Sequence, residues 1–199
     1  NMFEKRVGGW TTWEQVQLTP ATPRWADFIE QLPALGRRVV LASPCCGIHG
    51  SSRALQVMGV PADSVNTFDL DENYAFTLHN HCTEAGMGNF ILKLGKVCGD
   101  LLRVRLSQLK VPCDFLVAGP PCPPWSGSGN RASVDDPRAR VFFRILVWIY
   151  FLVHCGGLLG VVLENVTGIA MRYDNREPVI LMFLRVLRQH IPEFAWTVD

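Results

Sequence analysis

Short apolar runs alternate with helix-like segments from residue 38 onward, and this alternation limits the possible folds more than any other feature. The runs predicted as strands are 38–43, 64–69, 90–94, 114–119, 159–163 and 194–198. The segments with helical spacing are 53–59, 72–82, 139–154 and 178–190. Strands that are apolar on both faces and alternate with helices form parallel sheets covered by helices on both sides. We therefore predict an α/β fold with a mostly parallel sheet and helices on both faces.

The composition is that of a folded domain. The chain has 199 residues, of which 48% are hydrophobic and 19% are charged, and this excludes a disordered or fibrous chain. We predict one core domain over 38–199. Residues 1–37, which contain Trp10, Trp13 and Trp25, are predicted as a lead-in that packs on this core.

Charge and cysteine content limit the partners and the compartment. A net charge of +1 gives no global basic field, so any contact with nucleic acid must use local clusters such as 131–144, which holds four arginines. A solvated helix face explains that cluster equally well. The seven cysteines form no CxxC pair, so no metal site is predicted. Their odd number and the lack of a signal peptide favour reduced thiols inside the cell, in the nucleus of a eukaryote or the cytoplasm of a prokaryote.

Residues 145–163 carry no formal charge and are long enough to suggest a membrane span. Gly156 and Gly157 divide this run, and Glu164 and Asn165 follow it directly. We predict instead a buried helix, a glycine stop and a buried strand, with no membrane partner.

The unusual loops of the sequence all follow predicted strands. They lie at 43–52, 69–73, 99–101, 119–129 and 164–168. In parallel sheets, ligands bind beyond the carboxyl ends of the strands. The sequence therefore predicts a single site at that edge of the sheet.

Three of these loops have features of a nucleoside pocket. The stretch 46–50 contains two glycines and opens a helix, so its backbone can approach a ligand closely. Asp69 ends the second strand, where a carboxylate suits ribose hydroxyls, and Asp100 ends the third, where it could accept from an adenine amino group. A helix N-cap is the alternative role for each aspartate.

The remaining two loops carry a thiol and an acid. Cys122 stands between two pairs of prolines in "AGPPCPPWSGSG" (118–129), which stiffen the loop around it. Cys122 is either a small apolar turn residue or a nucleophile that must be held in position. Glu164 follows the neighbouring strand, and burial there would favour its protonated form. A thiolate that attacks an electron-poor ring while an acid protonates that ring is a consistent pair of roles.

These motifs resemble those of the cytosine-C5 DNA methyltransferase family. The resemblance rests on "GPPCPPWSGSG", "LENV" (163–166), the glycine loop, "GD" (99–100) and "NRASVDDPRARVFFRIL" (130–146), in this order. It covers about residue 39 to the C-terminus and implies a Rossmann-like methyltransferase fold with S-adenosylmethionine as the cofactor and S-adenosylhomocysteine as a product.

The resemblance also implies a mechanism and a set of site residues. Cys122 would add to C6 of a cytosine flipped from its helix, Glu164 would protonate or hydrogen-bond N3, and Asn165 would help to hold the cysteine loop. C5 would then take the methyl group, and β-elimination would free the product. The implied cofactor contacts are Cys45, Cys46, Gly47, Ile48, Gly50, Asp69, Leu70, Asp100, Leu101 and Pro121.

The sequence also departs from the family pattern. Pro123 stands where Gln or Asn usually follows the cysteine, Cys45 replaces an aromatic residue expected to stack on adenine, and His49 replaces a glycine. The motif "DLDENYA" (69–75) is one residue longer than usual. The chain is expected to lack the target-recognition segment, which a partner chain or a missing segment would supply. Three readings therefore stay open: a DNA methyltransferase, a tRNA methyltransferase of the same family, and a non-catalytic module on a degenerate methyltransferase fold.

Overall fold

The protein is built on one parallel sheet. The computed structural model describes residues 32, 36–47, 50–71, 73, 91–94, 99–127, 132–172 and 176–196. Its strands, in the spatial order β3-β2-β1-β4-β5, are β1 (Val39–Pro44), β2 (Ala62–Phe68), β3 (Ile91–Leu94), β4 (Phe115–Ala118) and β5 (Gly160–Leu163). All neighbouring pairs are parallel, which confirms the predicted sheet. The chain proceeds outward from β1 to β3 and then returns to β4, so the strand order reverses between β1 and β4, where ligands bind in such sheets.

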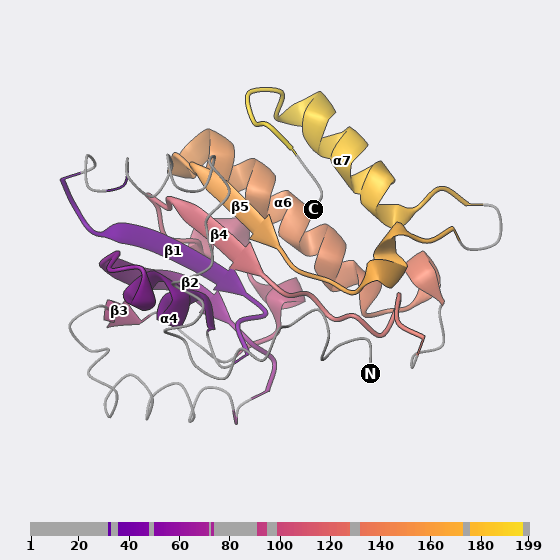
Figure 1. Ribbon diagram of the computed structural model, residues 1–199, viewed down its shortest axis with the longest axis horizontal. Coiled ribbons are helices and arrows are strands. Elements are labelled where there is room, and N and C mark those ends of the chain that lie inside the picture. Colours follow the sequence, from indigo (N-terminus) through magenta and orange to yellow (C-terminus); the bar gives the residue numbers. More distant parts are fainter. Residues whose placement is uncertain are drawn as a thin grey trace.

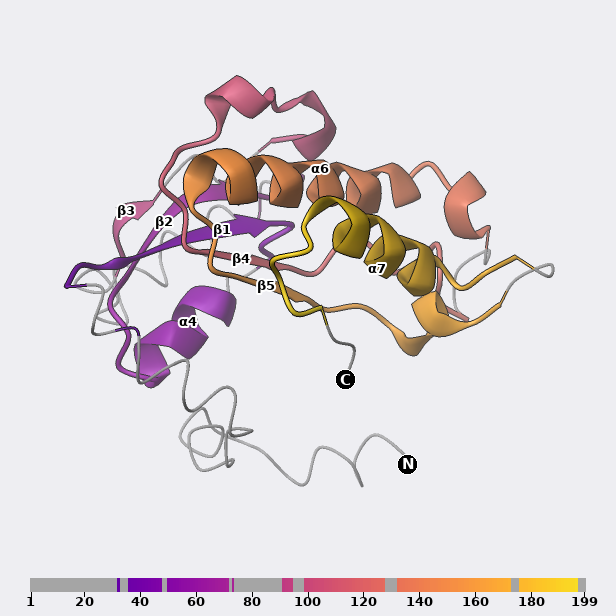
Figure 2. The same cartoon turned by 90° about the horizontal axis from the view of Figure 1, so that it is seen from above.

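Helices cover both faces of this sheet (Figures 1 and 2). Helix α4 (Gly50–Val57) lies on one face and α6 (Ala139–Gly156) on the other. Helix α7 (Val179–His190) lies alongside α6, beyond the β5 edge of the sheet. Because α4 begins directly beyond the loop that follows β1, its N-terminus lies near the carboxyl edge of the sheet.

The main core lies between the sheet and α6. Along α6 the side chains of Phe142, Ile145, Ile149 and Leu152 recur at helical spacing and are at most 2% exposed. Burying each large apolar side chain contributes about 1.5–3 kcal/mol. Helix α6 is long and apolar enough to span a membrane by length and composition, and in this fold its buried face supplies the centre of the core.

The predicted glycine stop ends α6. Gly157 has left-handed backbone angles, φ 70° and ψ 35°, and its N–H donates to the carbonyl of Leu152. A residue with a Cβ is strained in that conformation, so glycine is the suitable helix terminator here. The chain then turns directly into β5, as predicted.

The prediction of a sixth strand at 194–198 is wrong for its described part. Residues 194–196 form no strand, and 197–199 lie outside the described residues. The two aromatic side chains pack against each other and against the end of α7 instead. Phe194 and Trp196 stack with ring centroids 5.3 Å apart, and Trp196 Nε1 donates to the Ile191 carbonyl at 3.1 Å. Arg188 also donates to the Trp196 carbonyl at 3.2 Å, which engages a backbone group that a strand would use. The predicted lead-in and the predicted helix at 72–82 fall almost entirely outside the described residues.

Candidate active site

A cavity of about 580 Å³ lies at the carboxyl edge of the sheet, where β1, β4 and β5 end. One side of the cavity is formed by the loop after β1 and the first turn of α4, and the other by the end of β4 and the residue after β5. The lining residues are Ser43, Cys45, Cys46, Gly47, Gly50, Ser51, Val117, Ala118, Gly119 and Glu164. The cavity therefore joins the predicted cofactor loop to the predicted catalytic acid at the point where the strand order reverses.

The loop after β1 makes a tight left-handed turn. Cys45 has φ 57° and Gly47 has φ 50°, a conformation that is uncommon for residues other than glycine. The turn is held by two backbone donors, because Cys46 N donates to the Phe68 carbonyl at 3.1 Å and Gly47 N donates to Asp69 Oδ2 at 2.8 Å. Cys45 at a left-handed position is local strain of the kind that is found at binding loops.

Asp69 connects the three loops at this edge. Besides the bond from Gly47, its Oδ1 accepts from Asp71 N at 3.1 Å, and its carbonyl accepts from Gly99 N at 2.8 Å. Each carboxylate oxygen has a second lone pair, so the side chain keeps capacity for two ligand hydroxyls. The position is compatible with the predicted ribose contact.

Burial and the nearby carboxylate control the two thiols of the loop. Burial in the cavity wall, followed by the negative charge of Asp69, raises the pKa of Cys45 to about 12 and that of Cys46 to about 12. Both side chains are therefore neutral thiols at physiological pH. They can form the wall of a ligand site but are poor nucleophiles.

Glu164 and Asn165 extend from the end of β5 toward the cysteine loop. Glu164 N donates to the Ala118 carbonyl at 3.0 Å, which continues the pairing of β5 with β4. A Cβ at Gly119 would lie 3.3 Å from Glu164 Oε2, so the glycine leaves room for this carboxyl group. Asn165 Nδ2 donates to the Pro120 carbonyl at 3.2 Å, and this bond ties the end of β5 to the cysteine loop.

The expectation that Glu164 is buried is wrong. Its side chain is exposed, although it lines the cavity. The reason is topological: β5 is an edge strand of the described sheet, so no further described strand covers its outer side.

The Cys122 loop is held from both sides. The Cys122 carbonyl accepts from Trp125 N and Ser126 N, each at 2.9 Å, and this closes a tight turn. Trp125 is 1% exposed and meets Phe142 of α6 edge-on, with ring centroids 5.9 Å apart. Ser133 N donates to the Pro124 carbonyl at 3.1 Å. The Cys122 side chain itself is exposed, so it stands free at the end of an anchored loop.

Asp69, Cys122 and Asn165 are not among the residues that line the main cavity, and neither are the remaining predicted cofactor contacts among the described residues. Asp100 lines a separate hollow of about 590 Å³ next to Phe68 and Lys110. Asp100 also caps a short 3₁₀ turn by accepting from Leu102 N at 2.9 Å, so its alternative role as an N-cap is present in the structure. Leu70 is 75% exposed and Leu101 is 5% exposed, in the core. Pro121 is half-buried beside Cys122, and Ile48 lies outside the described residues.

Comparisons with known proteins identify the family of the chain. The model of the C-5 cytosine-specific DNA methylase family matches residues 41–189. The chain belongs to this family. Among solved structures, the Schizosaccharomyces pombe Dnmt2 methyltransferase superposes with a TM-score of 0.50 and 22% identity, over 77% of this chain and 41% of that one. An O-methyltransferase from Bacillus cereus solved with S-adenosylhomocysteine covers 88% of this chain and 74% of its own, with a TM-score of 0.44 and 13% identity.

The first likeness supports the Rossmann-like methyltransferase fold, which the parallel sheet already indicates. This methylase chain spans less than half the length of the Dnmt2 structure.

Sequence reasoning did not assign a role to one ion pair of this methylase chain. Asp136 is 6% exposed. Its carboxylate accepts three hydrogen bonds from Arg138, from Nε at 2.9 Å, from Nη2 at 2.7 Å and from the backbone N at 2.8 Å. The hydrogen bond to Asp136, with a smaller contribution from the Cys122 side chain, raises the pKa of Arg138. From the sequence, Arg138 is placed only in a basic cluster, and the Asp-x-Arg spacing of Asp136 and Arg138 is the signal that singles it out.

This ion pair predicts a specific acid sensitivity. The Arg138 hydrogen bonds lower the pKa of Asp136 from 3.8 to about 2. A lowered pKa stabilises the fold above the unfolded-state pKa, and that contribution is lost as the pH falls from about 4 through about 2. Asp136→Asn should remove this part of the pH dependence. Urea unfolding midpoints between pH 2 and pH 6 should therefore converge for the two proteins at the acid end, and parallel curves would contradict the assignment.

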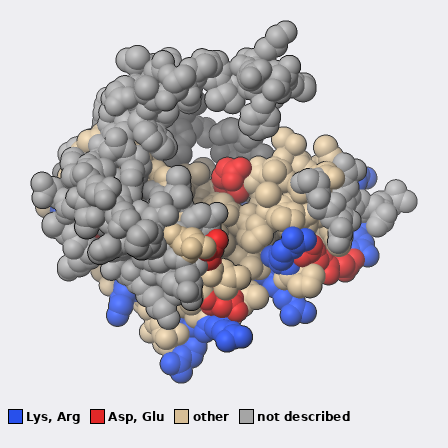
Figure 3. Space-filling model, turned by 90° about the horizontal axis from the view of Figure 1, so that it is seen from below, with Lys and Arg blue, Asp and Glu red and all other residues tan. Residues whose placement is uncertain are grey.

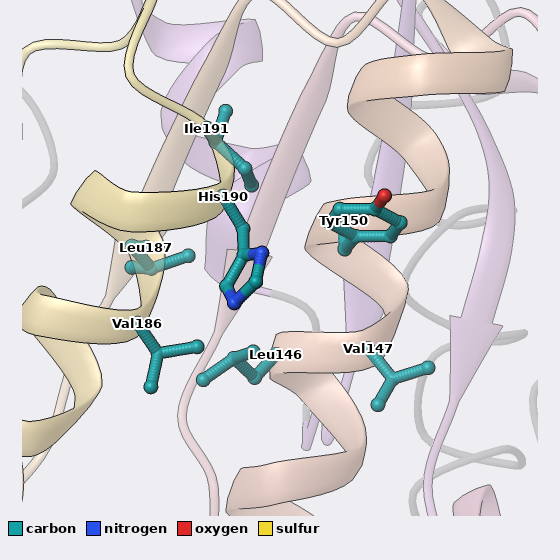
Figure 4. Close-up of a pocket in the computed structure, with 7 residues that line it drawn as sticks. All are labelled: Leu146, Val147, Tyr150, Val186, Leu187, His190 and Ile191. Carbon is teal, nitrogen blue, oxygen red and sulfur yellow. The ribbon is translucent and has the colours of Figure 1, made fainter.

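A further hollow of about 310 Å³ lies between α6 and α7 (Figure 4). Its walls are mostly apolar, with Tyr150 from α6 and His190 from the end of α7 as its polar members. The hollow shares no lining residue with the cavity at the strand ends, so we do not assign it to the reaction.

Proposed function

We propose that this chain is the catalytic core of an S-adenosylmethionine-dependent cytosine-C5 methyltransferase that acts on DNA. The observation that carries the proposal is the joint lining of one cavity by the loop after β1 and by Glu164, with the Cys122 loop bonded to Asn165 beside it. Family membership supports both the reaction and the cofactor. Residues 38–199 would form this core and residues 1–37 a lead-in.

The cavity fits the cofactor. Its volume of about 580 Å³ falls within the usual range for small-molecule sites. At Gly47 and Gly50 an added Cβ would meet nothing within 4 Å, so the backbone faces open space where a ligand can approach. The backbone of 45–47 in the cavity wall would hold the methionine part. Asp69 and Asp100 lie outside this lining and would extend the site to the ribose and the adenine. When bound, S-adenosylmethionine supplies an electrophilic methyl group.

The residues of the chain would prepare the base for that methyl group. The Cys122 sulfur adds to C6 of the cytosine, while Glu164 donates a hydrogen bond or proton to N3, so that negative charge develops at C5. After methylation, the C5 proton passes to solvent water and the C6–S bond breaks with its electron pair on sulfur. The proton donated to N3 returns to Glu164, so the ring and the thiolate are restored. Asn165 positions the cysteine loop through the Pro120 carbonyl rather than touching the base. A base inside a duplex cannot reach this site, so the cytosine would be flipped out.

The proposal that DNA is the substrate rests on the description of the family. Local clusters of basic side chains, rather than a large net positive charge, would bind the DNA. The net charge is +1, and Figure 3 shows basic and acidic side chains beside one another on the described part of one face. Offering duplex DNA and folded tRNA side by side, each with labelled methyl donor, tests this choice. If the labelled methyl group appeared in tRNA alone, the substrate would be RNA rather than DNA, and this part of the proposal would be wrong.

The cofactor site predicts binding of S-adenosylhomocysteine to the chain alone. We expect micromolar affinity by calorimetric titration, and at least a tenfold loss in Asp69→Ala, because this change removes both the ribose acceptor and the bond from Gly47. Asp69→Asn keeps an acceptor for Gly47 and should lose less. Comparing the affinities of the two variants distinguishes the effect of losing the ribose contact from the effect of losing the hydrogen bond that holds the loop after β1.

Glu193→Ala is the matched control, since Glu193 is an exposed acid beyond α7 and away from the cavity lining. Its affinity should equal that of the unchanged chain, and thermal unfolding should show that all variants are folded. A folded chain that does not bind S-adenosylhomocysteine would favour the non-catalytic module over the enzyme.

A further inference from the structure

Two adjacent thiols share the wall of the catalytic-edge cavity. Along an extended chain, neighbouring side chains point to opposite sides. Here the left-handed backbone at Cys45 interrupts that alternation, and both Cys45 and Cys46 line the same cavity. The negative charge that Cys46 would carry contributes to the raised pKa of Cys45, which agrees with sulfur atoms lying close together.

We propose that Cys45 and Cys46 form a dithiol site that binds trivalent arsenicals and thereby closes the cavity. In the reaction with phenylarsine oxide, two S–H bonds and the arsenic–oxygen bond break, two As–S bonds form, and both protons leave with the oxygen as one water molecule. Arsenic stays trivalent, so no oxidant or reductant is needed. The protons pass to the departing oxygen, so neutral thiols suffice.

Other uses of the pair fit the geometry less well. A disulfide usually joins Cα atoms that are 4.4–6.8 Å apart, whereas adjacent Cα atoms lie about 3.8 Å apart. Oxidation also proceeds through the thiolate, which is scarce when the pKa is about 12. Structural zinc requires four ligands, and the described residues contain no group of three or more metal-binding side chains. An arsenic atom between the two sulfurs makes a longer bridge than a disulfide bond, and it needs only two thiol ligands instead of the four that zinc requires.

The experiment is native mass spectrometry of the folded chain with one equivalent of phenylarsine oxide and excess 2-mercaptoethanol, which removes adducts held by a single sulfur. We expect one phenylarsenic group per chain, mapped to the peptide that contains Cys45 and Cys46. Cys45→Ser and Cys46→Ser should each lose it, whereas Cys155→Ser, which changes an exposed thiol at the end of α6, should keep it. Treatment with 1,2-ethanedithiol should release it.

Two results would overturn the proposal. One is an adduct that survives in either single variant, because then a different pair of thiols binds the arsenic. The other is an adduct that forms only in urea, because then the folded loop does not present both sulfurs to the cavity.

Blocking of cofactor binding by the arsenical rests on the proposed function, whereas the dithiol site itself does not. Competition with S-adenosylhomocysteine tests the two separately. If the cavity holds the cofactor, saturating S-adenosylhomocysteine should slow adduct formation at least tenfold. Adduct formation unaffected by S-adenosylhomocysteine would leave the dithiol site standing and count against the cavity as the cofactor site. Iodoacetamide at pH 7 provides a contrast, since it requires thiolates and should label exposed Cys155 well before Cys45 or Cys46.

Discussion

Replacing Cys122 by alanine is expected to abolish covalent capture of DNA that contains 5-fluorocytosine. Fluorine cannot leave C5 as a proton does, so an enzyme that adds sulfur to C6 and then methylates C5 remains attached to the base. The unchanged protein with its cofactor should give a slow-migrating species on a denaturing gel, and Cys122→Ala should give none. Methyl transfer to ordinary cytosine should fall on the order of 10³-fold or more, because removing a covalent nucleophile eliminates the catalysed route.

Two controls make this result specific to the thiol. Cys155→Ala removes another exposed thiol and should still form the adduct in full. Cys122→Ala should leave the unfolding temperature unchanged, because the loop is anchored by the Cys122 carbonyl and by Trp125, neither of which the change removes. Adduct formation by a folded Cys122→Ala protein would show that another residue is the nucleophile.

Glu164 should behave differently from Cys122 in the same assay. Glu164→Gln keeps a hydrogen-bond donor to N3 but cannot transfer a proton, so some adduct should form slowly. If the acid acts on the base, the rate of adduct formation should fall while the affinity for S-adenosylhomocysteine stays within a few-fold. A change in cofactor affinity alone would place Glu164 only in the cavity wall.

The order and type of the main elements could be predicted from the sequence because local pattern determines them. Apolar runs predicted β1 and β5, and the preference of glycine for left-handed backbone angles predicted that α6 ends at Gly157. The position of the site also followed from local features, since unusual loops at strand ends meet at one edge of any parallel sheet. These inferences need only nearest neighbours along the chain and the general rules of α/β folds.

Features that depend on distant partners could not be predicted. The exposure of Glu164 depends on what packs beyond β5, and the sequence of β5 contains no information about that. The bond from Gly47 to Asp69 joins residues from two loops and gives Asp69 a structural role besides ligand binding. Residues 194–196 have the apolar, aromatic composition of a strand, yet the stack of Phe194 on Trp196 turns them back toward α7.

Trp148→Ala is expected to destabilise the protein by about 3–5 kcal/mol, a large share of the about 5–15 kcal/mol that stabilises a typical domain. Trp148 is fully buried in α6 and meets Phe68 edge-on, with centroids 5.5 Å apart and an interplanar angle of 81°. Phe68 ends β2, and its carbonyl accepts from Cys46 N in the cofactor loop. The cavity left by the indole would therefore loosen the support of the proposed site as well as the core.

Trp148→Phe separates the volume of this side chain from its polarity. The buried Nε1 of Trp148 has no hydrogen-bond partner among the described residues, so removing this N–H relieves an unmet donor while an aromatic ring still packs on Phe68. The phenylalanine variant should therefore lose less than half as much stability as the alanine variant in urea unfolding. It should also bind S-adenosylhomocysteine with nearly unchanged affinity. Equal losses in the two variants would mean that the indole N–H has a partner in the native protein, and that polarity rather than packing volume makes tryptophan necessary beneath the cofactor loop.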